Sequence, residues 1–251
     1  MERIDSSGEK RAFSALPFAV ALYVLYLILP AVALADELTV YSVFLLNYTL
    51  WAEILMLASA GCAVLVSLRG CAWSKPSSVL LGLSPLLAVL NAFCFLDPMS
   101  EMTDARKLLV VACLIVSGAA CCYMCVRFSR SRPLMITVLS INGVILIPLA
   151  FFVFIACTFG SIGADTVVRS LPSPDGRLIA EVIDDDQGAL GGSTQVWIRG
   201  SREGSFLLIG WKETGKRLYY GKWGEFNRMT LEWKDGETLL IDGKSYRAEY
   251  P

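Results

Sequence analysis

Five long apolar segments fill the chain before residue 160, and they limit its possible folds more than any other feature. They are roughly Phe13–Ala35, Val43–Leu68, Val79–Leu96, Leu108–Val126 and Leu134–Phe159. Each approaches or exceeds the ~20 residues that cross ~30 Å of hydrocarbon as a helix. None shows the recurring polar face of a helix in a soluble protein. Since only a helix satisfies its own backbone in lipid, we expect a multi-pass membrane domain of five transmembrane helices over residues 13–160.

The composition agrees and excludes several functions. Apolar residues make up 55% and charged residues 18%, against about 45–50% and 25% in soluble proteins. A net charge of −1 argues against a nucleic-acid partner. With no His in the chain, general bases, nucleophile pairs and metal or haem sites that use His are excluded.

Basic residues in the connecting segments predict the orientation. Residues 1–12, 69–78 and 127–133 carry eight Lys or Arg, whereas residues 36–42 and 97–107 carry two. By the positive-inside rule, the N-terminal segment is cytoplasmic and the protein is a plasma-membrane protein. Five crossings then place residues 164–251 outside the cytoplasm, after a small-residue hinge at Gly160–Ala164.

The first apolar segment has a second interpretation. Ala31–Ala35 ends in an A-x-A pattern and is followed by Asp36 and Glu37, so it also resembles a signal-peptide cleavage site. The apolar stretch is longer than usual for a signal peptide, which favours a retained helix. The second segment enters from outside in either case.

Beyond the hinge the pattern changes to short strands separated by turn residues. Ser173-Pro-Asp-Gly176 predicts a type I turn, and Lys234-Asp-Gly236 and Asp242-Gly243 predict hairpins. The expected strands are Arg177–Ile183, Thr194–Arg199, Phe206–Trp211, Lys216–Tyr220, Arg228–Trp233, Glu237–Ile241 and Lys244–Tyr250. They predict a small all-β domain, an antiparallel sandwich or rolled sheet.

This domain contains no Cys, so its core cannot depend on disulfides. We expect the core to be built from aromatic residues: Trp197, Trp211, Trp223, Trp233, Tyr219 and Tyr220.

Four motifs of this region resemble a known family. They are Ser173-Pro-Asp-Gly-Arg177, Asp186-Gln-Gly-Ala-Leu-Gly-Gly192, Gly221-Lys-Trp-Gly-Glu225 and Trp233-Lys-Asp-Gly-Glu-Thr-Leu-Leu-Ile241. Together they are similar to a domain of unknown function in bacterial, mainly Gram-positive, membrane-attached proteins. The resemblance covers about 80 residues and none of the membrane part. It implies an extracytoplasmic β-domain and supplies no catalytic residue.

Glu53 is the one ionisable residue deep within an expected span. Ten positions from a helix start at Val43, it lies about 15 Å down, near the midplane. It should then be neutral or paired, with Thr49 on the same face and Asn91 and Asn142 as candidate partners. One interpretation is that Glu53 relays protons or cations. The other, which we favour, is that a neutral Glu53 forms a hydrogen bond between two helices.

Small residues recur in two of the expected helices. Ala58 and Cys62 in the second, and Gly118 and Cys122 in the fourth, have the small-xxx-small spacing that lets helices approach closely. We therefore expect these two helices to pack in parallel. Cys121-Cys-Tyr-Met-Cys125 lacks a second Cys pair or a His for a zinc site. Packed thiols are favoured over metal, redox or acylation roles, so no metal or other cofactor is expected.

Two surface motifs in the β-domain could bind ligands. Asp184, Asp185 and Asp186 precede a Gly-rich stretch and could hold Ca²⁺, although their spacing is not that of an EF-hand and a solvated turn is favoured. Trp223 and Glu225, among glycines, could form a ligand platform. For Trp223 a place in the core is favoured.

Three function classes remain. The sequence favours a membrane protein that displays the β-domain to bind or sense an extracytoplasmic protein or envelope partner. The alternative is a small transporter or channel component that uses Glu53. An enzyme is not expected, because no nucleophile–base pair, metal cluster or phosphate-binding loop occurs. The lipid bilayer is the one partner that the sequence specifies, and it does not specify an oligomeric state.

Overall fold

The computed structural model of the chain describes residues 13–68, 71–72, 74–100, 102–159, 164–188 and 191–248. They divide into two compact units. The helical unit takes residues 1–31, 47–96 and 102–153, and the β-unit takes residues 32–46, 97–101 and 154–251. The predicted cytoplasmic segment and most of the predicted hinge lie outside the described residues.

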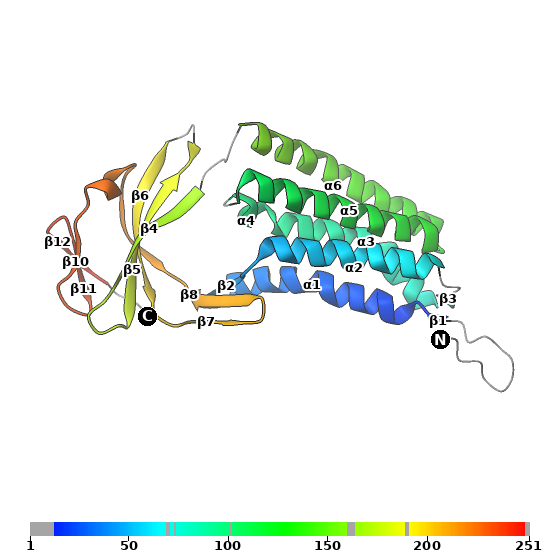
Figure 1. The fold of residues 1–251 in the computed structure, drawn as a ribbon, viewed down its shortest axis with the longest axis horizontal. Helices are drawn as coiled ribbons and strands as arrows, with labels where there is room; N and C mark the ends of the chain where they lie inside the picture. The colour runs from blue at the N-terminus through cyan, green and yellow to red at the C-terminus, as the bar shows by residue number, and fades with distance from the viewer. Residues whose placement is uncertain are drawn as a thin grey trace. The chain divides into compact units, whose positions relative to one another are not determined.

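The helical unit contains long apolar helices that run side by side (Figure 1). The described helices are α1 (Leu16–Leu38), α2 (Tyr48–Leu68), α3 (Lys75–Cys94), α4 (Leu96–Ser100), α5 (Asp104–Phe128) and α6 (Arg132–Phe159). Four of them, α1, α2, α3 and α5, are long and apolar enough to cross a membrane. In α6 the apolar stretch found among the described residues is shorter, Arg132–Ile145. The chain is thus a membrane protein with a β-domain, and four of the five expected spans meet the length and composition criteria.

Packing in the helical unit follows one stripe on each helix. On α1 the buried residues recur every three to four positions: Ala19, Leu22, Tyr26, Leu29 and Val32. The outward faces are also apolar; Val24 is 60%, Leu57 67% and Ile115 65% exposed. A helix that is apolar on all sides suits a lipid environment rather than water.

The second helix begins later than predicted. Residues Tyr41–Leu45 form strand β2, and α2 starts at Tyr48, where the Asn47 side chain accepts a hydrogen bond from Leu50 N (3.0 Å). Asn is a favoured helix cap because its side chain satisfies a backbone N–H of the first turn. The prediction of a helix from Val43 was wrong, since Val43-Phe-Leu45 suits a strand equally well and a distant strand provides its partner.

The β-unit contains three antiparallel sheets (Figure 1). The largest has the order β4 (Ala164–Pro172), β5 (Leu178–Asp186), β6 (Gly192–Gly200) and β9 (Lys216–Lys222). A second sheet has the order β10 (Leu231–Trp233), β11 (Thr238–Ile241) and β12 (Lys244–Arg247). In the third, β8 (Ile209–Glu213) lies between β2 and β7 (Glu203–Phe206).

The first two sheets share one core. Its buried side chains come from β5, β6, β10, β11 and the segments beside them: Leu178, Ala180, Val182, Val196, Ile198, Met229, Leu231, Leu239, Ile241 and Ala248. Trp233 and Tyr219 pack at its edge, as expected. Tyr220 and Trp223 are 63% and 55% exposed, so their assignment to the core was wrong. Strand alternation points Tyr219 inward and Tyr220 outward.

One predicted strand is in fact a hairpin. The apolar run Phe206–Trp211 is interrupted at Leu207, whose φ is +53°, and the chain reverses so that Phe206 pairs with Ile209. Pattern alone missed the turn because neither Gly nor Asn marks it.

Candidate functional site

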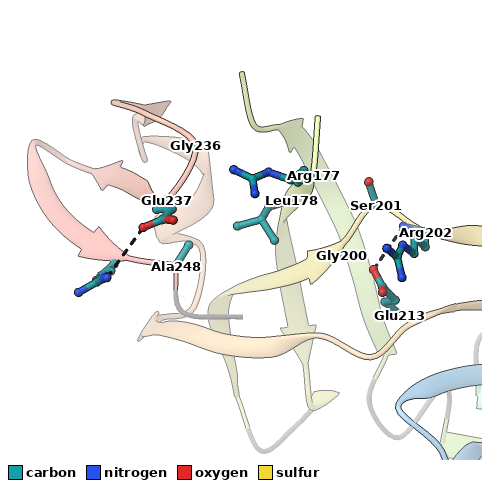
Figure 2. Close-up of a pocket in the computed structure, with 10 residues that line it drawn as sticks. Arg177, Leu178, Gly200, Ser201, Arg202, Glu213, Gly236, Glu237 and Ala248 are labelled. Carbon is teal, nitrogen blue, oxygen red and sulfur yellow. Dashed lines mark hydrogen bonds and ion pairs between the residues drawn. The ribbon is translucent and has the colours of Figure 1, made fainter. Parts of the chain in front are cut away.

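The β-unit has a charged cleft of about 530 Å³ (Figure 2). Half of its ten lining residues are charged: Arg177, Arg202, Glu213, Glu237 and Arg247. Only two, Leu178 and Ala248, are apolar and larger than glycine. The volume is in the range of small-ligand sites, but the lining is far more polar than is usual for them.

The turn before β5 positions Arg177 at the cleft. Gly176 N donates to Ser173 O (2.9 Å), which closes the predicted turn. Within it, Ser173 Oγ donates to Asp175 (2.7 Å) and Arg177 Nε donates to the other carboxylate oxygen (2.6 Å). These hydrogen bonds, that from Ser173 most of all, lower the pKa of Asp175 to about 2. Arg177 nevertheless remains 76% exposed and available to a ligand.

Two glycines allow the other walls to approach. A Cβ on Gly200 would lie 1.5 Å from the carboxylate of Glu213, and one on Gly236 would lie 2.8 Å from that of Asp175. Gly200 thus lets β8 reach the end of β6, and Gly236 lets the β10–β11 turn reach the Ser173–Arg177 turn. A side chain at either position would push charged groups out of the cleft wall.

The ion pairs around the cleft differ in burial. Arg247 and Glu237 are 3.9 Å apart, with side chains 72% and 65% exposed. Between β5 and β6, Arg199 Nε donates to Glu181 (2.8 Å), and both side chains are close to one-tenth exposed. Exposed pairs contribute little energy and can be exchanged for a ligand, whereas the buried pair is structural. The cleft therefore presents guanidinium groups that can bind carboxylate or phosphate through paired hydrogen bonds.

Sequence reasoning did not predict this cleft, because its arginines are scattered along the chain at strand ends. Arg177 and Glu237 lie within motifs of the family resemblance, but no spacing pattern links them to Arg202 and Arg247. Only the meeting of two sheets and a hairpin brings them together.

The three predicted acidic residues do not converge on one point. They are the last three residues of β5, where the alternation of side chains places Asp184 and Asp186 on one face and Asp185 on the other. Asp185 accepts hydrogen bonds from Ser193 (2.8 Å) and Gln195 (3.0 Å). Burial, followed by the charge of Asp186, raises the pKa of Asp184. No group of three or more metal-binding side chains occurs among the described residues, so the calcium site stays a prediction without a formed site.

The predicted ligand platform is split as well. Trp223 is exposed and lies against Gly192, where a Cβ would be 2.7 Å from its ring. Glu225 instead accepts a hydrogen bond from Tyr219 OH (2.9 Å), which raises the pKa of Tyr219 to about 12. Glu225 therefore holds Tyr219 in place at the edge of the core. A platform role for Trp223 stays a prediction.

The later start of α2 changes the position of Glu53. It lies five residues after Tyr48, about 8 Å along the helix rather than near the midplane. It is half-buried, as is Thr49 in the first helical turn. Asn91 donates to Tyr26 O (2.7 Å) and Leu87 O (3.0 Å) instead. Asn142 donates to Val138 O (2.8 Å). Among the described residues, no hydrogen bond joins Glu53 to Thr49, Asn91 or Asn142, which removes the main support for a relay.

A buried polar contact that sequence reasoning missed joins α1 to the other helices. The Tyr26 and Ser117 hydroxyls are hydrogen-bonded, and the Cys121 thiol donates to Tyr26 OH (3.7 Å). Tyr23 OH donates to Leu80 O (2.7 Å). The signal for it was a Tyr pair within an otherwise apolar first segment. These contacts hold helices together in a medium where packing and hydrogen bonds replace the hydrophobic effect.

Helices α2 and α5 pack against each other. On α2, Cys62 is buried and Ala58 half-buried, and on α5 Cys122 is half-buried while Cys121 and Cys125 are buried free thiols. A Cβ on Gly118, however, would meet no atom within 4 Å. The tight position is Gly82 on α3, where a Cβ would lie 3.3 Å from Ser129 Oγ.

Comparison of the chain with protein-family models, with curated proteins and with solved structures gave no match.

Proposed function

We propose that this protein crosses the plasma membrane five times and displays its β-domain outside the cytoplasm, where the arginine-lined cleft binds a ligand that bears carboxylate or phosphate groups. The observation that carries the proposal is the cleft itself, a space of about 530 Å³ that Arg177, Arg202 and Arg247 line. We further propose membership of the membrane-attached family that the β-domain motifs resemble, whose domains are extracytoplasmic.

Strand pairing supports the fifth crossing. β2 lies between α1 and α2 in the chain, and it pairs with β8 of the C-terminal domain from Tyr41↔Glu213 to Leu45↔Ile209. The two strands must share one side of the membrane, so the chain must cross an even number of times between them. Helices α2, α3 and α5 make three crossings, and α6 has to supply the fourth. The distribution of Lys and Arg then favours the outer side for both strands.

A ligand titration with arginine variants tests the cleft. The full chain in lipid nanodiscs is titrated with inorganic phosphate and, separately, with a short dicarboxylate, and the thermal unfolding midpoint of the β-domain is followed. Arg177→Gln should weaken binding about 10- to 100-fold, because a charged hydrogen bond contributes about 1.5–3 kcal/mol. The matched control is Arg217→Gln, an exposed arginine that lies over Tyr220, outside the cleft.

Equal loss in both variants would mean non-specific charge attraction and would refute the cleft. No stabilisation of the unaltered chain by either probe would refute the proposed ligand class.

Paired cysteines test the topology. Ser42 and Lys212 are partners in the β2–β8 register, so Ser42→Cys together with Lys212→Cys should form a disulfide when oxidant is added to intact cells. A membrane-impermeant maleimide should label the single Lys212→Cys variant without lysis. Labelling that requires lysis would place the domain in the cytoplasm.

A further inference from the structure

The tip of the β7–β8 hairpin exposes two large apolar side chains. Phe206 is 69% exposed and Leu207 is 82% exposed, the highest value among the described large apolar residues. They adjoin each other at the reversal of the chain, so they form one apolar point rather than scattered surface residues. Nothing described within the β-unit covers them.

The backbone at the tip is strained by the choice of residue. Leu207 has a φ of +53°, in the left-handed region that favours glycine, and it occupies the first loop position of a two-residue hairpin. The one other described non-glycine residue with a positive φ is Asp242, whose carboxylate accepts a hydrogen bond from Thr230 N (2.8 Å). The aliphatic side chain of Leu207 can form no such bond, so nothing within the turn offsets the backbone cost of a leucine at this position.

Strand pairing ties this tip to the segment of the chain that directly precedes α2. Ile209 pairs with Leu45, and Leu46 N donates to Leu208 O (2.8 Å). One residue after Leu46, Asn47 caps α2, a helix long enough to cross a membrane. Along the chain, a single hydrogen bond and one residue thus separate the tip from the start of a helix that can cross a membrane.

The hairpin is apolar at its tip and becomes charged toward its other end. At the tip, the paired row Phe206–Ile209–Leu45 is entirely apolar. At the other end, Glu203 pairs with Lys212 and Tyr41 pairs with Glu213. With a rise of about 3.3 Å per residue, the charged end stands roughly 13 Å from the tip. That separation keeps the charges in water while an apolar tip reaches the ~5–10 Å depth of interfacial insertion.

We propose that the β7–β8 hairpin inserts Phe206 and Leu207 into the boundary between headgroups and acyl chains, in the leaflet where α2 begins. The hairpin gives the β-unit a contact with lipid in addition to its covalent links to the helices. The proposal depends on α2 spanning the membrane and on the β2–β8 pairing. It depends neither on the ligand of the cleft nor on which side the domain occupies, so it can fail or hold independently of the proposed function.

Photolabelling of the unaltered chain tests the insertion. The protein is reconstituted into phosphatidylcholine vesicles that contain a small share of a lipid with a diazirine on its acyl chain, irradiated, and digested with trypsin. Cleavage after Arg202 and Lys212 releases the hairpin as Glu203–Lys212, and cleavage after Lys222 and Arg228 releases Trp223–Arg228. The second peptide is the matched control, since Trp223 is also an exposed aromatic residue.

Lipid adducts on the hairpin peptide at several times the yield of the control peptide are expected. Replacing both tip residues, as Phe206→Ser with Leu207→Gly, should lower the adduct yield several-fold while the glycine relieves the turn and preserves the hairpin. Absence of adducts on the hairpin, equal adducts on both peptides, or an unchanged yield in the double variant would each overturn the proposal. Absence of lipid adducts, together with a link between the Lys212 side chains of two chains when a bifunctional amine-reactive reagent is added, would identify a second copy of the chain as the occupant.

Discussion

The buried ion pair between Glu181 and Arg199 should be the most sensitive charged position of the β-domain. The pair spans 2.8 Å between β5 and β6, with side chains 12% and 11% exposed. Arg199 also lies 3.2 Å from Glu203, which is 61% exposed. Breaking a buried pair costs about 3–5 kcal/mol, because one charge is left without its partner. Since Glu203 still offers partial compensation, we expect Glu181→Ala to cost about 3 kcal/mol.

Thermal unfolding in nanodiscs measures this cost. Four of the six tryptophans lie in the β-domain, so tryptophan fluorescence reports mainly on it. For a domain of this size, 3 kcal/mol corresponds to a fall in Tm of about 12 °C or more. The matched control is the exposed pair between Arg247 and Glu237, where Arg247→Gln should cost less than about 1 kcal/mol.

A double variant decides whether the unpaired charge is the cause. Replacing both partners, as Glu181→Leu with Arg199→Met, removes both charges and should restore most of the lost stability. If Glu181→Ala costs no more than the exposed control, or if the double variant is as unstable as the single one, the pair is not effectively buried and the reasoning is wrong.

Three further results are expected. Hydrogen bonds lower the pKa of Asp175 from 3.8 to about 2, so the β-domain should lose stability as the pH falls through that interval. Acid titration of the Asp175→Asn variant should show a smaller loss of stability. The same loss in both proteins would contradict this prediction. Gly192→Ala should destabilise the domain by about 1–3 kcal/mol in thermal unfolding, because its Cβ would lie 2.4 Å from the backbone oxygen of Asp185. In the helical unit, Gly118→Ala should be tolerated and Gly82→Ala should lower the Tm; the reverse order would mean that α5 packs through Gly118.

The turns of the β-domain could be predicted from neighbouring residues, whereas the cleft depends on residues that are far apart in the chain. Ser173-Pro-Asp-Gly176 forms the predicted turn because its hydrogen bonds are local. Likewise, β10, β11 and β12 follow the predicted hairpins, since Asp-Gly turns dictate reversal over a few residues. The cleft could not be predicted in this way, because Arg202 and Arg247 come to line the same cleft only when β8 and the β10–β12 sheet lie at the ends of β5 and β6.

The sequence by itself determined the four long apolar helices before residue 130 and the β character of the C-terminal region, because apolar length and strand alternation are properties of consecutive residues. Tertiary structure alone decided that Val43-Phe-Leu45 forms a strand and that the chain reverses at Leu207. A short apolar run is compatible with a helix, a strand or a turn, and its hydrogen-bonding partner selects among them. Here the partner of β2 lies more than 160 residues away in β8, and that pairing joins the hairpin to the segment just before α2.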